Sequence, residues 1–471
     1  MLLTLLLGCD QTAPSSQTLP LTPCHVTNLD AESLCGTLSV PEDPSALDGK
    51  TIDLHVLVVP AVSPNPEPDP LFFLAGGPGQ AASEVAAAML PALDRVQKRR
   101  DLVFVDQRGT GKSAPLHCPD PGEMTLAEEL ALDSAQFAVD CLASLDTDPG
   151  LYITPIAMDD LDAVREALGY ETINLYGASY GTRAGLVYMR RHPERVRTAI
   201  LDGVAPLEMV LGLHFATDGH AALTAVFDDC AASLACAEAF PTLAVDFQGL
   251  LDSLPRTIDF TQGRTGEPEM LELTRELLVG GVRGQLYSPT FASLLPLAIT
   301  DAVAGDFSPI MAQTIGFSEG MADSMSDGMQ LAVLCAEDVH RLPADLGPFI
   351  DGTFLGDAVI ADLAAVCAGW PTPALPDGYY EPVKSDAPTL LLSGVLDPVT
   401  PPRWADLAAE TLPNSRHLIA PGAGHNVAPL GCVPRLMAEF IDAGSAADLE
   451  TDCVDTITRP PFFIDFAGPA K

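Results

Sequence analysis

The stretch LYGASYG, from Leu175 to Gly181, decides how this chain folds. It has the pattern G-x-S-x-G, with Ser179 between Gly177 and Gly181. A strand-like apolar run precedes it and the helix-like run YGTRAGLVYMRRHP follows it, so the serine lies where a strand turns sharply into a helix. Such a turn lifts the hydroxyl out of the sheet and aims the N–H groups of the helix at negative charge. A serine that only capped a helix would not need both glycines, so the pattern indicates a nucleophile.

Strand-like and helix-like segments alternate on both sides of this turn. Strand-like runs lie at residues 51–60, 70–79, 102–108, 172–179 and 198–206. Helix-like runs at 83–100 and 158–169 separate some of them. This order predicts an α/β fold with a mostly parallel central sheet and helices on both faces.

The pattern changes after Pro206. From there to about Lys384 the chain is rich in Ala, Leu, Met and Asp, with helical periodicity and no clear strands. Strand-like runs resume with APTLLLSGVLDPVTPP at 387–402. We therefore expect a terminal anchor and tether (1–23), a first part of the core (24–206), an inserted helical cap (207–384) and a second part of the core (385–471).

A serine nucleophile needs a general base and an acid that orients the base. The segment SGVLDPVTPP places Asp397 just after one strand, and PGAGHNV places His425 just after the next. Both then lie at the carboxyl edge of the sheet, as Ser179 does, in the order serine, acid, histidine. Asp202 also ends a strand, but this order favours Asp397, and we expect Asp202 to be a structural turn residue.

Two backbone N–H groups must stabilise the oxyanion that forms during attack. One should belong to Tyr180, the residue after the nucleophile. The other should come from GGPG at 76–79, where Gly77 is the expected donor and Gly76 the alternative. The predicted mechanism needs no metal and no organic cofactor.

The stretch DLVFVDQRGTGKSAP at 101–115 ends like a phosphate-binding loop. That loop requires G-x-x-x-x-G-K-[ST], but Asp106 occupies its first glycine position and would repel phosphate. Prolines follow at 115, 119 and 121, where a helix should begin. The sequence therefore supports no nucleotide site.

The same stretch resembles the DQRGxGxS segment of the proline iminopeptidase and tripeptidyl aminopeptidase (TAP-like) family of α/β-hydrolases. The resemblance extends to GGPG, GASYGTRAGLVYMRRHPERV, CAED, GVLDPVTP and GAGHN, in the family's order, from about residue 35 to 455. It implies an α/β-hydrolase fold with a helical cap between the sixth and seventh core strands. It also implies a serine peptidase that releases one to three residues from a free peptide N-terminus.

The resemblance suggests roles for two further pairs of residues. Asp106 and Arg108 would form a buried structural pair that shapes the loop near the site. Glu337 and Asp338, in VLCAEDVHR, would bind the substrate's ammonium; the alternative is that both carboxylates are solvated. Ala75 stands where iminopeptidases usually have histidine, as in looser variants of the tripeptidyl branch.

Charge and cysteines limit the partners and the compartment. The chain has 24 Lys and Arg against 64 Asp and Glu, a net charge of −40, which disfavours nucleic acid and anionic lipid and suits a soluble protein or a cationic peptide end. Apart from Cys9, ten of the 11 cysteines remain, an even number that suggests disulfides in an exported chain. The simplest pairing joins neighbours in sequence: 24–35, 118–141, 230–236, 335–367 and 432–453. Zinc is disfavoured because the chain has no C-x-x-C pair.

The N-terminus reads MLLTLLLGCDQTAPSSQTLPLTP. Its apolar run is too short to span a bilayer. LLGC, ending at Cys9, resembles the bacterial lipoprotein box, in which the cysteine carries the lipid; an ordinary cleaved signal is the alternative. We therefore expect a lipid-anchored or secreted serine exopeptidase of the cell envelope, with a secreted carboxylesterase or a non-catalytic scaffold as alternatives.

Overall fold

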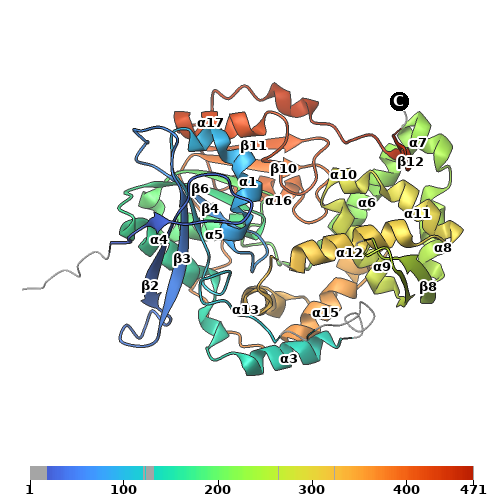
Figure 1. Ribbon diagram of the computed structural model, residues 1–471, viewed down its shortest axis with the longest axis horizontal. Helices are drawn as coiled ribbons and strands as arrows, with labels where there is room; N and C mark the ends of the chain where they lie inside the picture. Colours follow the sequence, from blue (N-terminus) through green and yellow to red (C-terminus); the bar gives the residue numbers. More distant parts are fainter. Residues whose placement is uncertain (1–17, 120–121, 123–131, 264, 323, 470–471) are drawn as a thin grey trace, which may run out of the picture.

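One nine-stranded sheet forms the core, in the order β1-β2-β3-β5-β4-β6-β7-β10-β11 (Figure 1). The computed structural model describes residues 18–119, 122, 132–263, 265–322 and 324–469. The strands are β1 (Thr22–Pro23), β2 (Leu34–Pro41), β3 (Thr51–Val59), β4 (Leu71–Leu74), β5 (Leu102–Val105), β6 (Ile173–Ala178), β7 (Val196–Asp202), β10 (Thr389–Gly394) and β11 (Ser415–Ala420).

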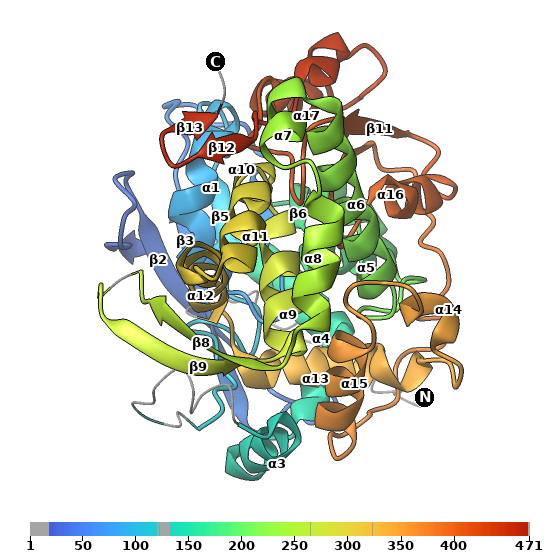
Figure 2. The ribbon, with the colours of Figure 1, turned by 90° about the vertical axis from the view of Figure 1, so that its right-hand side faces the viewer.

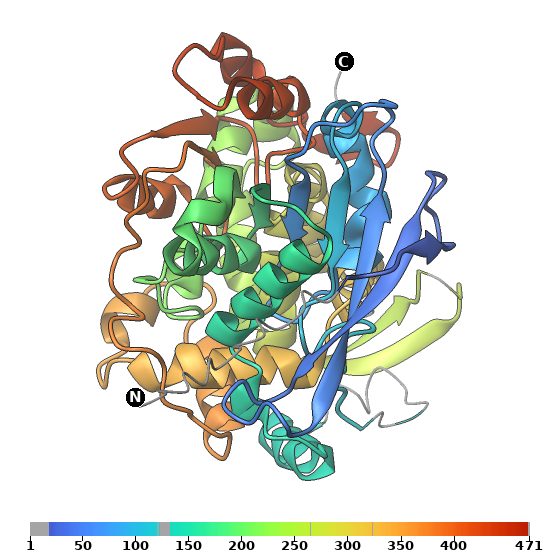
Figure 3. The ribbon, with the colours of Figure 1, turned by 90° about the vertical axis from the view of Figure 1, so that its left-hand side faces the viewer.

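The sheet is antiparallel near one edge and parallel elsewhere. β2 and β3 pair antiparallel, as do β3 and β5, whereas the remaining neighbours from β5 to β11 are parallel. The long strands β2 and β3 are drawn in blue in Figure 3. This topology confirms the prediction of a mostly parallel sheet.

Helices cover both faces of the sheet. On one face lie α4 (Thr154–Ala167), α5 (Tyr180–Arg191) and α16 (Pro402–Ala409), and on the other α1 (Ala82–Gln97) and α17 (Val433–Ala443). Consecutive residues of β4 show the two sides: Phe72 packs into the first cluster and Phe73 into the second. Because both faces are covered, the central strands are apolar throughout rather than alternating.

The insertion between β7 and β10 forms the cap, which Figure 2 shows in front of the sheet. Its helices are α6 (Phe215–Ala232), α7 (Leu234–Ala239), α8 (Leu243–Asp252), α9 (Arg275–Leu286), α10 (Pro289–Ala292), α11 (Leu295–Ala304), α12 (Ser308–Ala322), α13 (Asp327–Glu337), α14 (Gly347–Ile350) and α15 (Ala358–Cys367). All lie within residues 207–384, where the sequence predicts the cap.

The expectation that the cap has no strands is wrong. β8 (Arg256–Thr261) and β9 (Pro268–Leu273) pair as an antiparallel hairpin. Only Ile258 and Phe260 of β8 are buried, so the alternating pattern spans two side chains and is too short to stand out among helical segments. The hairpin packs its apolar side into the cap's own hydrophobic cluster.

Five disulfides join neighbouring cysteines, as the sequence predicts. Two of them meet in one small hydrophobic cluster: 118–141 holds α3 (Ser134–Ser144), and 335–367 links α13 to α15. Cys9 lies outside the described residues, so the lipidation prediction is not addressed by the structure. Within the described ranges, no helix has the length and apolar character of a membrane span.

Candidate active site

Ser179 lies at the turn between β6 and α5, with backbone angles of φ 55° and ψ −122°. A positive φ is strained for serine, as expected for a nucleophile held at a sharp turn. The flanking glycines allow the turn: a Cβ on Gly177 would overlap the carbonyl of Gly181, and one on Gly181 would overlap the carbonyl of Leu74 in β4. The G-x-S-x-G pattern thus forms the predicted strand-to-helix turn.

Asp397 and His425 meet just beyond β10 and β11. His425 Nδ1 lies 2.8 Å from Asp397 Oδ2, so its N–H donates to the carboxylate and Nε2 is left for the serine. Asp397 also accepts hydrogen bonds from the N–H groups of Val399 and Thr400, each at 2.8 Å, and from Thr400 Oγ1 at 2.8 Å. The carboxylate is therefore buried, fully bonded and fixed against the imidazole.

The charges of this pair support each other. Burial alone would raise the pKa of Asp397, but the positive charge and hydrogen bond of His425 outweigh it and lower that pKa. Burial alone would lower the pKa of His425, but Asp397 raises it overall; Asp202 adds to this effect and Arg283 opposes it. The imidazolium that forms when a base takes a serine proton is thus stabilised.

Asp202 joins the serine turn to the histidine segment. Its carbonyl accepts the N–H of Ser179 at 2.9 Å and Asn426 Nδ2 at 2.9 Å. Its buried carboxylate accepts the N–H groups of Val427 at 2.8 Å and Ala428 at 2.9 Å. One residue at the end of β7 therefore fixes both the nucleophile and the loop that carries the base.

The sequence predicts a structural role for Asp202 at the end of a strand. It does not predict that Asp202 connects the serine turn to the histidine segment. Its position at a strand end beside β6 and β10 is the signal that could have revealed it. Tyr287, after α9, is also missed: its carbonyl accepts the N–H of His425 at 2.9 Å, and its ring packs edge-on against the imidazole with centroids 5.2 Å apart. No local pattern marks Tyr287, because the contact exists only when the cap folds over the core.

Two of the three predicted oxyanion donors, Tyr180 and Gly76, lie directly beside Ser179. Tyr180 is the first residue of α5, so its N–H has no acceptor within the helix. Gly76 lies against the nucleophile, since a Cβ there would be 3.4 Å from Ser179 Cβ, and Gly77 follows with φ 105°. Gly77 as the second donor therefore remains a prediction, with Gly76 nearer to the serine.

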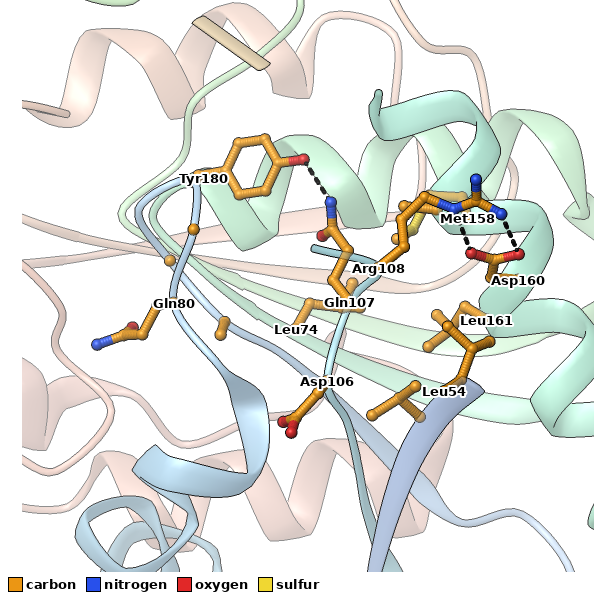
Figure 4. A pocket seen from close by; sticks show the side chains of 15 residues that line it. Leu54, Leu74, Gln80, Asp106, Gln107, Arg108, Met158, Asp160, Leu161 and Tyr180 are labelled. Carbon is orange, nitrogen blue, oxygen red and sulfur yellow. Dashed lines mark hydrogen bonds and ion pairs between the residues drawn. The ribbon is translucent and has the colours of Figure 1, made fainter. Parts of the chain in front are cut away.

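The Tyr180 side chain points into a small cavity behind the serine turn (Figure 4). Its hydroxyl is 2.7 Å from Thr154 Oγ1 and accepts a hydrogen bond from Gln107 Nε2 at 3.2 Å. The cavity holds about 20 Å³, room for roughly one water molecule. The cavity is therefore too small to hold a substrate.

Asp106 and Arg108 are buried but do not pair with each other, which corrects the expectation from the family resemblance. Asp106 accepts the N–H and hydroxyl of Ser83 at 2.8 and 2.9 Å, whereas Arg108 pairs with Asp160 at 2.6 and 2.9 Å. Figure 4 shows the two side chains pointing apart. Residues two apart in an extended segment point to one face but here diverge because the strand has ended at Val105.

Glu337 and Asp338 are fully buried and bonded inside the protein, which contradicts both the ammonium-binding prediction and the solvated alternative. Glu337 accepts Thr154 N–H at 2.7 Å and Tyr379 OH at 2.5 Å, and burial raises its pKa. Asp338 pairs with Arg183 of α5 at 2.7 Å, and both side chains are fully buried. Both carboxylates fasten the cap to the core, a role that the motif CAED alone does not distinguish from ligand binding.

No cluster of three or more His, Cys, Asp or Glu side chains in the described parts of the chain is arranged to hold a metal ion. The arrangement at the sheet edge is instead that of acyl transfer: a strained serine, an imidazole fixed by a buried carboxylate, and the N-terminus of α5 directly after the serine.

Comparison with known proteins agrees with this chemistry. Residues 69–228 match the family model described as alpha/beta hydrolase fold, and residues 352–453 match the one described as TAP-like protein. Serine protease Hip1 of Mycobacterium tuberculosis is 28% identical, over 93% of this chain and 91% of its own. Tripeptidyl aminopeptidase of Streptomyces lividans is 32% identical over 38% of this chain and 36% of its own, and carboxylesterase B of M. tuberculosis is 29% identical over 78% and 76%.

The first family model covers the serine turn, and the second covers the segment with Asp397 and His425. The matched residues therefore include all three residues of the predicted triad. The chain belongs to the α/β-hydrolases, in their TAP-like branch, and is a serine hydrolase.

Proposed function

We propose that this chain is an exported serine peptidase that releases one to three residues from free N-termini of short peptides through an acyl-enzyme. The observation that carries the catalytic part is the 2.8 Å contact between His425 and Asp397, in a loop bonded through Asp202 to the turn that carries Ser179. The similarity to a serine protease over nearly the whole chain supports peptide bonds as the target.

In this mechanism His425 Nε2 takes the proton of Ser179 Oγ as the oxygen attacks the carbonyl carbon. The N–H groups of Tyr180 and of Gly77 or Gly76 stabilise the oxyanion. The imidazolium, stabilised by Asp397, then donates its proton to the leaving amine as the C–N bond breaks. Water, activated by the same imidazole, hydrolyses the acyl-enzyme and regenerates Ser179.

The compartment follows from the disulfides. Five closed disulfides suit an oxidising compartment outside the cytoplasm. We place the protein in the bacterial cell envelope, held by a lipid on Cys9, or in the extracellular space if the leader is cleaved as an ordinary signal. Labelling cells with a radioactive fatty acid tests this, because Cys9→Ser would abolish incorporation only if Cys9 is lipidated.

A secreted carboxylesterase with the same three residues is the second candidate. Two observations favour it: carboxylesterase B is similar over 78% of this chain, and the carboxylates predicted to bind the substrate amine are bonded inside the protein. An esterase needs no ammonium site, so this difference separates the two candidates.

A substrate panel decides between them. Aminoacyl- and tripeptidyl-anilides, their N-acetylated forms and a short acyl ester are compared as kcat/KM, with Ser179→Ala as the blank. Turnover of free-amine anilides at least tenfold above the acetylated forms is the expected result. Equal turnover of both anilides, with faster turnover of the ester, would overturn the exopeptidase and leave the esterase. No turnover of any substrate by a folded protein would overturn both.

A further inference from the structure

Arg283 places a positive charge of the cap beside the histidine. It lies on α9 with its guanidinium 4.4 Å from the ring centre of Phe215 and 5.4 Å from that of Tyr287, to whose hydroxyl it donates at 3.2 Å. Tyr287 in turn packs edge-on against His425. The Tyr287 ring therefore contacts both the guanidinium of Arg283 and the imidazole of His425.

Arg283 has no acidic partner among the described residues, although the chain carries 64 acidic side chains against 24 basic ones. Its Nε is buried and makes no hydrogen bond. Arg403, by contrast, pairs with Asp218 of α6. An unsatisfied buried donor is costly, so the contacts of Arg283 within the protein leave part of its hydrogen-bonding capacity unused.

The charge of Arg283 also opposes the triad. It lowers the pKa of His425, whereas Asp397 raises it, so the guanidinium disfavours the imidazolium on which acyl transfer depends. A negative group bound to Arg283 would cancel this effect. The cation therefore suits a site that is completed by an anionic substrate.

The position relative to His425 tells which end of the substrate is bound. In acyl transfer the imidazolium gives its proton to the leaving group, which consequently lies on the histidine side of the scissile bond. Resting on the proposed acyl-transfer function, we propose that Arg283 binds a carboxylate on the leaving group, so that substrates with an anionic leaving group are preferred. The planar guanidinium can bind both oxygens of a carboxylate at once.

Two sources supply such a carboxylate: the C-terminus of a short peptide, or an Asp or Glu side chain directly after the cleaved bond. Peptides that end one residue after the cleaved bond, as free acid or as amide, test the first source. Longer amidated peptides with Glu or Gln in that position test the second. A preference in one pair only identifies the source.

The test compares the wild-type enzyme with Arg283→Gln, and with Arg256→Gln as a matched control. Arg256 is an exposed cap arginine over the ring of Phe307 at 5.1 Å, so its loss removes the same charge and a similar ring contact. The wild type should prefer the anionic member of a pair by about 10- to 100-fold in kcat/KM. Arg283→Gln should lose that preference, and Arg256→Gln should keep it. An unchanged preference in Arg283→Gln, or no preference in the wild type, would overturn the proposal.

Aryl acetates keep this test separate from the peptidase proposal. The 4-carboxyphenyl and 4-carbamoylphenyl acetates differ in leaving-group charge, and comparing their ratio between enzymes cancels their intrinsic reactivities. A ratio that falls in Arg283→Gln supports the anion site even if no peptide is cleaved. If the enzyme cleaves peptides but Arg283→Gln leaves the ratio of anionic to neutral substrates unchanged, for both peptides and aryl acetates, the peptidase proposal stands. The role of Arg283 is then overturned.

Discussion

The sheet edge and the cap face the same serine but are built differently. At the sheet edge, Ser179, Asp397 and His425 each follow a strand of the core sheet, and backbone hydrogen bonds fix them. In the cap, contacts with the core come from isolated residues on and beside helices, such as the Asp338 side chain on Arg183 and the ring and carbonyl of Tyr287 on His425. The sheet edge carries the residues proposed to react, and the cap carries residues that pack around them.

This difference explains why the contacts at the sheet edge can be predicted from the sequence, whereas those of the cap cannot. A strand end places a side chain at a known edge, so the order of motifs predicts neighbours. A helix on a cap can dock in many ways, so CAED could indicate a ligand site or a structural pair. Mutations at the edge should therefore change the reaction, and mutations at the cap junction should change stability.

The largest effect is expected at the edge. Asp397→Asn should lower kcat/KM by about 10,000-fold, because the imidazole loses its orienting carboxylate. The control is Asp406→Asn, which breaks a similar contact of 2.9 Å with His417 away from the site and should leave activity within about twofold. Initial rates on an activated ester measure both, and similar losses in the two variants would contradict the assignment.

The cap junction should respond in stability. Asp338→Asn leaves Arg183 buried without its charge partner and should lower the free energy of unfolding by about 3–5 kcal/mol, measured by urea denaturation with disulfides intact. Glu439→Gln, which removes an exposed helix pair with Arg435, should cost about 0.5 kcal/mol or less. Unchanged stability with a raised KM only for free-amine substrates would instead restore Asp338 as an ammonium site.

Asp202 joins the serine turn to the histidine segment, and its expected effect is smaller than the two above. Asp202→Asn keeps the carbonyl that holds Ser179 but weakens the carboxylate's bonds to Val427 and Ala428, so kcat should fall about 10- to 100-fold with KM nearly unchanged. Because Asp202 raises the pKa of His425, the acid limb of the pH profile should also move to lower pH. A loss of activity without a shift of the pH profile would show that Asp202 acts only by positioning the histidine loop, and not through its charge.

The smallest effect is a shift of the pH profile. His425 must be neutral to act as a base, and its pKa is raised, so kcat/KM of the wild type should fall as pH drops through a midpoint above the ordinary value of about 6.5. Arg283→Gln removes an opposing charge and should move that midpoint higher, whereas Arg256→Gln should not. A midpoint below 6.5 in the wild type would contradict the electrostatics described for the edge.

The sequence predicts the core strands from β3 onward, a largely helical segment at 207–384 and all five disulfides, because strand periodicity and neighbouring cysteines are local signals. It misses the β8–β9 hairpin, whose pattern is short, and the partners of Asp106, Arg108, Glu337 and Asp338, which come from distant segments. Each miss is a case in which tertiary packing overrides a local preference.

Covalent labelling with a fluorophosphonate tests the central claim most directly, because only a serine activated by a base reacts rapidly. Intact mass should show one adduct per chain, and peptide mapping should place it on Ser179. Ser179→Ala should abolish the adduct, Asp397→Asn should slow it strongly, and the exposed cap variant Ser253→Ala should label like the wild type. A folded wild-type protein that does not react, or an adduct that persists at another serine in Ser179→Ala, would contradict the account.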